Sequence, residues 1–196
     1  MKRPPGPKVT AFRYDEIFNE AVREAVRAKS KLLTHYIVLA RTTIKPLPRD
    51  YLFDLRAFCV LASAVLEQCA EDLAWANAFE MCDEINRYVA TGRSRTLANA
   101  SGLLRDYVEG VVLRTHGIKE DQFQKIVSGV GINVKLTGNQ TTSFEQLGRM
   151  RGESAHTYAV GQKSPQEVWD YVRDVLAAIR SFALSCSGGT GSFISV

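Results

Sequence analysis

An arginine and a histidine near the C-terminal end of the chain carry the side chains that phosphate chemistry needs. Arg151 and His156 are separated by four residues, in a segment that we expect to be helical from residue 144 to about residue 158. A histidine, with an unperturbed pKa of about 6.5, can take up or return a proton near neutral pH. An arginine stays charged and can hold phosphate oxygens while negative charge builds up in a transition state. This pair is therefore the first candidate for a reaction at a phosphate group.

Helix geometry separates the two side chains. At about 100° per residue, Arg151 lies about 140° from His156 and falls on the apolar side that contains Phe144. Arg149 lies only about 20° from His156, and Glu153 is on the same polar side. Arg151 and His156 can still meet if the helix is distorted or ends near His156, or if the arginine of one copy serves the histidine of another.

Three segments of the chain are together similar to the HEPN superfamily, whose motif is an arginine, four to six residues and a histidine. Segment 151–156 (Arg-Gly-Glu-Ser-Ala-His) matches the motif just before a final amphipathic helix. Segment 55–71 looks like the long early helix of the branch called RiboL-PSP-HEPN, and segment 116–119 (His-Gly-Ile-Lys) is also similar to that branch. The resemblance covers roughly residues 50–185, and Arg149 keeps the longest spacing that the family's motif allows.

The resemblance implies a homodimer in which two copies of the motif face each other, and cleavage of RNA with no metal and no other cofactor. Arg151 would be the phosphate clamp and His156 the acid–base group, with Arg149 as the second candidate for the clamp. The RNA 2′-hydroxyl would attack the neighbouring phosphorus and leave 2′,3′-cyclic phosphate and 5′-hydroxyl ends. The family further implies that Glu67 contacts the site arginine and that Tyr158 is a possible target of adenylylation by an antitoxin.

The same residues also have structural interpretations. Arg151 could be a snorkelling arginine paired with a buried acid such as Glu67, which could equally be an ordinary surface glutamate. His156 could interact with the dipole at a helix end. Tyr158 lies on the apolar side of the expected helix, so packing in the core is favoured for it. Glu153 is expected on a plain solvated face.

Composition and charge limit the classes of protein. The 196 residues are 45% hydrophobic, enough for one domain with a core, and the longest apolar runs are too short for a membrane span. Residues 1–50 hold 11 Lys and Arg against 5 Asp and Glu, which suits an RNA partner or, equally, a solvated helix face with a loose arm. The N-terminus lacks a signal-peptide core, and four scattered cysteines are expected to be reduced. We therefore expect a cytoplasmic protein without a metal site.

The chain is expected to be all-α, an antiparallel bundle with an N-terminal helical extension. We expect a disordered basic arm (1–10), an N-terminal helix within 11–49 that runs to about residue 41, the bundle (50–185) and a flexible Gly/Ser-rich tail (186–196). Asp50 is expected to cap a long helix over 51–89 with a kink or break, and further helices are expected at about 96–114 and 120–128. Residues 129–142 are expected to be a loop, with Ser143 as the cap of the motif helix. Ser164, Pro165 and Glu167 form a capping box for the last helix.

Two functions from different classes remain open at this stage. The first is a metal-independent endoribonuclease that acts as a toxin or antiphage effector on RNA. The second is a non-catalytic HEPN module that binds RNA or a nucleotide, or that serves as a dimerising adaptor in a defence or toxin–antitoxin system. Both would have an antitoxin or defence-system protein as a partner and no contact with a membrane.

Overall fold

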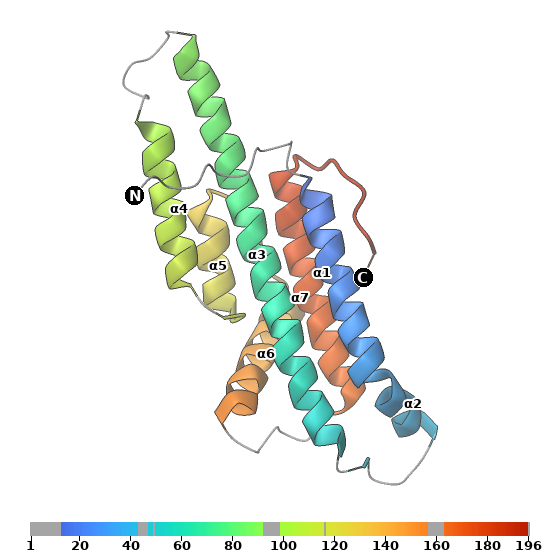
Figure 1. Cartoon of the computed structure of the whole chain (residues 1–196). Helices are drawn as coiled ribbons and strands as arrows, with labels where there is room; N and C mark the ends of the chain where they lie inside the picture. The colour runs from blue at the N-terminus through green and yellow to red at the C-terminus, as the bar shows by residue number, and fades with distance from the viewer. Residues whose placement is uncertain are drawn as a thin grey trace, which may run out of the picture.

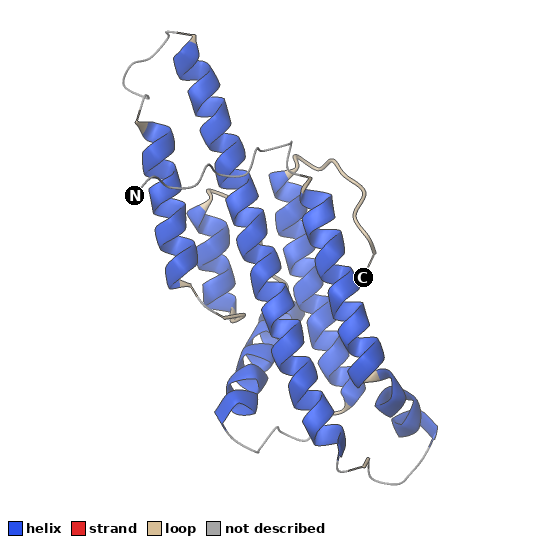
Figure 2. Ribbon diagram, in the orientation of Figure 1, coloured by secondary structure: helices blue, strands red, loops and turns tan. Residues whose placement is uncertain are grey.

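The computed structural model describes residues 13–42, 47–48, 50–91, 99–115, 117–156 and 163–195, apart from the side chains of residues 113 and 154–156. Within these ranges the chain is helical and contains no strand, which confirms the expected all-α class (Figures 1 and 2). The helices are α1 (Tyr14–Leu32), α2 (Thr34–Thr42), α3 (Asp50–Ala90), α4 (Ala100–Arg114), α5 (Glu120–Gly129), α6 (Gly138–His156) and α7 (Pro165–Cys186).

The long helix α3 is the spine of the bundle. It contacts α1, α6 and α7, as well as α4 and α5, and Figure 1 shows the last two beside its upper half. The expected break is wrong, because α3 continues for 41 residues without interruption. Its buried residues extend from Tyr51 to Cys82, so successive turns of the helix find packing partners. Asp50 is the first helical residue rather than the residue before the helix.

The N-terminal helix belongs to the same core. Phe18 and Ala25 of α1 are fully buried, and α1 packs against both α3 and α7. The prediction of one helix to about residue 41 is wrong, because the helix is interrupted at Leu33, where the backbone turns with φ −120°. The Leu33 side chain is fully buried, which holds this turn in place, and α2 leaves at an angle (Figure 1).

The helix that carries the motif begins earlier than expected. Residues 138–142 are helical rather than a loop, and Ser143 is a buried residue inside α6 whose hydroxyl donates to Asp174 Oδ2 at 2.8 Å. The cap lies at Thr137 instead. The Gln140 backbone N–H donates to Thr137 Oγ1 (3.3 Å), and the Thr137 N–H donates to Gln140 Oε1 (2.9 Å), which is the pattern of a capping box.

The last helix begins with the predicted capping box, and the tail that follows it contacts α1. The Glu167 N–H donates to Ser164 Oγ (3.2 Å) and the Ser164 N–H to Glu167 Oε2 (2.8 Å), so the expected capping box is confirmed. The tail was expected to be flexible, yet residues 187–195 lie against α1. Asn19 Nδ2 donates to the carbonyl of Ser192 (2.7 Å), and the phenyl rings of Phe18 and Phe193 lie 5.9 Å apart.

The apolar side chains of α4 are divided between the core and the surface. Val108 and Val112 are buried, whereas Leu103 and Tyr107 are 70% and 59% exposed. Cys59, Cys69 and Cys82 are buried and unpaired, as expected for small apolar core residues. None of the described helices combines the length and the apolar character that crossing a membrane requires.

Candidate functional site

The motif helix α6 is held against α3 and α7 by its apolar side. Phe144, Leu147 and Met150 are almost completely buried. Arg151 follows Met150 and lies about one turn beyond Leu147 on the same side of the helix. The guanidinium of Arg151 is therefore directed at α3, as counting along the sequence predicted.

On α3 the guanidinium meets a buried carboxylate. Arg151 Nη1 lies 2.9 Å from Oε2 of Glu67, a residue with only 9% of its surface exposed. The other carboxylate oxygen, Oε1, accepts a hydrogen bond from the backbone N–H of Gly117. The expected contact between Glu67 and Arg151 is confirmed, and the interpretation of Glu67 as an ordinary surface residue is wrong.

Gly117 has a conformation that favours glycine. Its φ is +118°, and a Cβ at this position would clash with the side-chain amide of Gln122. The turn between α4 and α5 thus presents a backbone N–H to Glu67 from one side while Arg151 approaches from the other. The carboxylate is fixed by both, so it fixes the guanidinium in turn.

Arg151 is not enclosed by this pairing. Its side chain remains 36% exposed, and a guanidinium has five N–H groups, of which the contact with Glu67 occupies a part. The remaining N–H groups can reach an anion at the surface. The arrangement is a partly exposed cation that a buried carboxylate positions.

His156 is the last residue of α6. The helix continues through Gly152 without interruption, so no break brings His156 toward Arg151 before the helix ends. The two backbone positions therefore remain about 140° apart around the helix. The side chain of His156 and all of Tyr158 lie outside the described residues.

Arg149 and Glu153 lie on the other side of α6 and pair with each other. Arg149 Nε is 3.8 Å from Glu153 Oε1, and Arg149 Nη2 donates to Gln146 Oε1 at 2.7 Å. Both side chains line a hollow of about 610 Å³ between α5 and α6. The charged residues around the hollow are two cations and four acids: Lys119, Arg149, Glu120, Asp121, Glu145 and Glu153. This excess of negative charge disfavours a phosphate, so the geometry favours Arg151 over Arg149 as a clamp.

Two contributors to this region were not singled out from the sequence. Gly117 belongs to segment 116–119, for which the sequence indicates a family resemblance but no role, and its hydrogen bond to Glu67 is not visible in a local pattern. Lys119 lies across Gly148, where a Cβ would come within 2.6 Å of Lys119 Cγ. The glycine therefore lets the lysine stem approach α6 closely, and the glycine spacing on α6 (Gly148 and Gly152) was the available signal.

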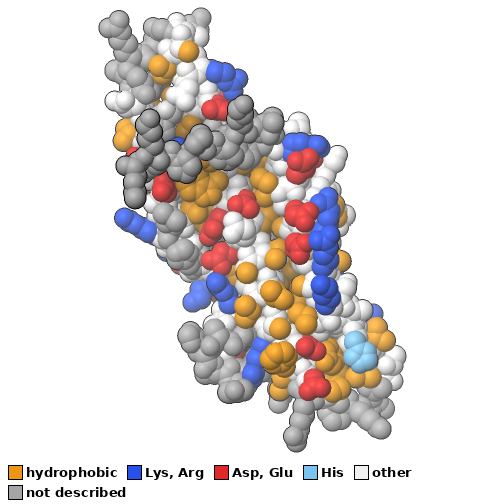
Figure 3. Space-filling model, in the orientation of Figure 1, with side chains coloured by type: hydrophobic (Ala, Val, Ile, Leu, Met, Phe, Trp, Pro, Cys, Tyr) orange, Lys and Arg blue, Asp and Glu red, His pale blue; other side chains and the backbone are white. Residues whose placement is uncertain are grey.

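The basic character of the N-terminal third is mostly balanced along α1. Arg13 is 2.7 Å from Glu16, and Arg23 is 2.6 Å from Glu20. Figure 3 shows this row of alternating charges beside the apolar side chains of the bundle. Between residues 13 and 42 there are 6 Lys and Arg against 4 Asp and Glu, so most of the basic excess of residues 1–50 lies outside this range.

Within the part of the chain that the structure describes, no three His, Cys, Asp or Glu side chains gather in a way that could hold a metal ion. A comparison of the chain with protein-family models, with curated proteins and with solved structures finds no match.

Proposed function

We propose that this protein is a metal-independent endoribonuclease of the HEPN type, acting in the cytoplasm as a toxin or antiphage effector. The observation that carries the proposal is the Glu67–Arg151 pair. Glu67 is nearly buried and is anchored by Gly117, and it holds a partly exposed guanidinium five residues before a histidine. A cation that is held rigidly and still has open N–H groups is suited to bind the charge of a transition state without rearranging.

The proposed reaction needs only groups that the chain has. The oxygen of an RNA 2′-hydroxyl attacks the adjacent phosphorus, and its proton passes to a neutral His156. The bond from phosphorus to the 5′-oxygen breaks, and the leaving oxygen takes a proton from a protonated His156. Arg151 binds the phosphate oxygens as their negative charge increases. The products are a 2′,3′-cyclic phosphate and a 5′-hydroxyl.

In a dimer, the arginine of one copy would serve the histidine of the other, and the His156 that takes the 2′-hydroxyl proton would return it to the leaving oxygen. The face of α3 next to the pair supports such a dimer, because Phe53 and Val60 form an exposed apolar row seven residues apart, with Phe53 at 75%, and the exposed Leu61 lies beside it. Glu67 follows Val60 by two helical turns on nearly the same side of α3. Figure 3 shows hydrophobic side chains on the face of α3 that is turned to the viewer. A second copy docked on this row would lie beside Arg151.

Cleavage of total RNA in the presence of EDTA tests the proposal. The wild type should cleave RNA, and both Arg151→Ala and His156→Ala should reduce the rate by about 100-fold or more. His35→Ala and Arg87→Ala are matched controls in α2 and at the end of α3, and they should cleave at the wild-type rate. Full activity of the two motif variants, each with a helical circular dichroism spectrum, would exclude the proposed site.

Mixing the two inactive variants distinguishes a site within one chain from a site shared between copies. If the arginine of one copy serves the histidine of the other, a heterodimer of Arg151→Ala and His156→Ala keeps one of its two sites intact. Random exchange of subunits should then restore about a quarter of the wild-type activity. A site confined to one chain would give no recovery.

A further inference from the structure

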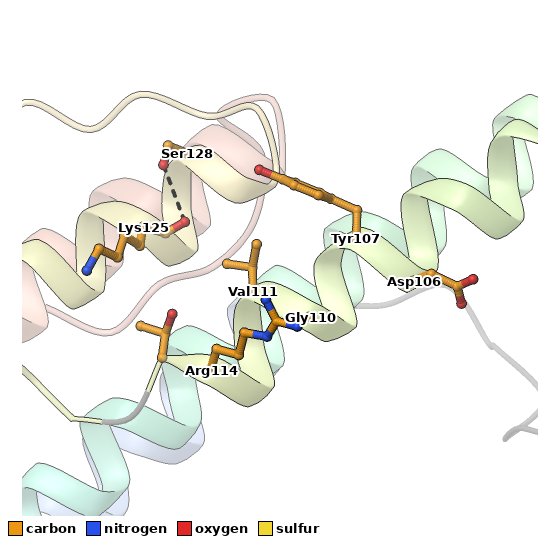
Figure 4. Close-up of a pocket in the computed structure, with 8 residues that line it drawn as sticks. Asp106, Tyr107, Gly110, Val111, Arg114, Lys125 and Ser128 are labelled. Atoms are coloured by element: carbon orange, nitrogen blue, oxygen red, sulfur yellow. Dashed lines mark hydrogen bonds between the residues drawn. The ribbon is translucent and has the colours of Figure 1, made fainter.

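A second hollow, of about 510 Å³, lies between α4 and α5, away from the motif. Its lining combines one aromatic ring with cations and hydroxyl groups: Asp106, Tyr107, Gly110, Val111, Arg114, Thr115, Lys125 and Ser128. Figure 4 shows Tyr107 and Arg114 rising from α4, and Lys125 and Ser128 on the facing helix. Of the lining residues only Asp106 is acidic, and Figure 4 shows its carboxylate directed away from the others.

Three of the residues that line the hollow from α4 lie in one row, and Leu103 extends this row beyond the lining. Leu103, Tyr107, Gly110 and Arg114 follow one another at intervals of four, three and four positions, so they lie on one side of the helix. Leu103 and Tyr107 are mostly exposed, although both are apolar enough to be expected in the core. Leu103 and Tyr107 form an exposed apolar surface on α4, and Arg114 lies at the C-terminal end of the same row.

The two cations are available to a ligand. Arg114 is exposed and has no ion pair with another described side chain. Lys125 Nζ is 3.3 Å from Asp121 Oδ2, but both side chains are more than half exposed, so this pair is weak and a phosphate can compete for the lysine. Ser128 and Thr115 add hydroxyl groups beside them.

Gly110 leaves the floor of the hollow empty. It lies inside a helix, where glycine is unfavourable, and a Cβ on it would meet nothing within 4 Å. A side chain at this position would not clash with the rest of the protein, but it would occupy part of the hollow.

We propose that this groove binds single-stranded RNA, with a base stacked on Tyr107 and a phosphate held by Arg114 and Lys125. The inference rests on the proposed ribonuclease function and gives its substrate a second point of attachment. An aromatic ring next to cations is the arrangement by which proteins bind single strands without reading their sequence. A base has a π-face whatever its identity, so the groove selects an unpaired strand rather than a sequence.

The length of the row favours a strand over a free nucleotide. From Leu103 to Arg114 the row rises by about 16 Å, and Tyr107 and Arg114 alone are about 10 Å apart along the axis. This is long enough for more than one nucleotide. A mononucleotide would use the ring or the cations together with only part of the row.

The binding of a fluorescein-labelled 12-nucleotide single-stranded RNA to the full chain, followed by anisotropy, tests the inference. His156→Ala is used as the background so that the RNA stays intact. Tyr107→Ala should weaken binding by about five-fold or more, and Tyr107→Trp should not weaken it. Gly110→Leu should weaken binding by filling the floor, while the helix gains rather than loses stability. Tyr88→Ala and Gly102→Leu are the matched controls, an exposed tyrosine and a helical glycine outside the groove, and they should bind as the background does.

The dependence of Kd on salt concentration separates the role of Arg114 from that of Tyr107. The slope of log Kd against log salt should fall by about 0.7 for Arg114→Ala, because one phosphate contact is lost. Tyr107→Ala should lower the affinity and leave the slope unchanged. These two results, with unchanged binding by the control variants, would support RNA binding in the groove.

Two results would overturn the inference, and they differ in what they mean for the ribonuclease. RNA binding that the groove variants leave unchanged rejects the groove and leaves the ribonuclease proposal standing. Absence of RNA binding by the His156→Ala protein also rejects the groove, and the cleavage of total RNA by the wild type then decides the ribonuclease proposal on its own.

Discussion

Removing the charge of Glu67 should uncouple Arg151 from α3, and the structure indicates how much stability this costs. Glu67→Gln keeps the size of the side chain and an oxygen for the Gly117 N–H, so it removes mainly the ion pair. A buried hydrogen bond to a charged group contributes about 1.5–3 kcal/mol, and an exposed pair contributes about 0.2–1 kcal/mol. Glu67 is nearly buried and Arg151 is partly exposed, so we expect a coupling of about 1–2 kcal/mol between them.

A double-mutant cycle measures this coupling. The free energy of unfolding in urea is compared among the wild type, Glu67→Gln, Arg151→Met and the double variant. For a chain of this length the loss should lower the Tm of Glu67→Gln by about 2–8 °C. Arg149→Met with Glu153→Gln is a matched cycle on the solvated side of α6, and its coupling should stay below about 0.5 kcal/mol.

The same variant should lower RNA cleavage. At a temperature where the protein is fully folded, Glu67→Gln should cleave about ten-fold more slowly, because the guanidinium is no longer fixed. It should cause no further loss in an Arg151→Ala background. A coupling below about 0.5 kcal/mol, or an unchanged rate in Glu67→Gln, would refute the argument that Glu67 positions the arginine.

Three other predictions concern the parts around the site. Gly152→Ala should raise the free energy of unfolding by up to about 1 kcal/mol, because its Cβ would meet nothing within 4 Å. Gly148→Ala should lower the free energy of unfolding, because its Cβ would displace the side chain of Lys119. Urea titrations of both variants measure these changes. Phe53→Asp should shift the protein toward monomer in analytical ultracentrifugation, and an unchanged mass would remove the α3 row as the dimer face. A hydrogen bond from the Ser192 backbone N–H holds the pKa of Asp15 below its ordinary value of 3.8. Asp15 should therefore stabilise the fold above about pH 4 and lose this effect as the pH falls through its lowered pKa. Unfolding by acid should therefore depend less on pH in Asp15→Asn, and equal profiles would contradict this role.

The fold class could be predicted from the sequence because its signals are local. The capping box at Ser164 and the apolar stripe of the last helix are complete within a few residues, and the structure contains both. The start of α6 was missed although Thr137 and Gln140 form the same kind of box, because the neighbouring glycine and asparagine favour a loop. The local signal for a helix start is present at Thr137, but the composition of the surrounding residues is typical of a loop.

Other features depend on contacts between distant segments. The tail after α7 has a flexible composition, and it is held by hydrogen bonds to Asn19 and Asp15, 173 or more residues earlier, and by the contact between Phe193 and Phe18. The break at Leu33 is likewise set by burial that no local pattern indicates. The Glu67–Arg151 pair could be anticipated from helix counting, but the N–H of Gly117 that completes it could not.

If Arg151 and His156 cleave RNA by attack of the 2′-hydroxyl, the chemical nature of the product ends must show it. A single-stranded RNA oligonucleotide is incubated with the wild type in EDTA, and the fragments are identified by mass spectrometry. We expect 2′,3′-cyclic phosphate and 5′-hydroxyl ends from the wild type, and intact RNA from Arg151→Ala. Fragments with 3′-hydroxyl and 5′-phosphate ends, or the same fragments from Arg151→Ala at the wild-type rate, would contradict it.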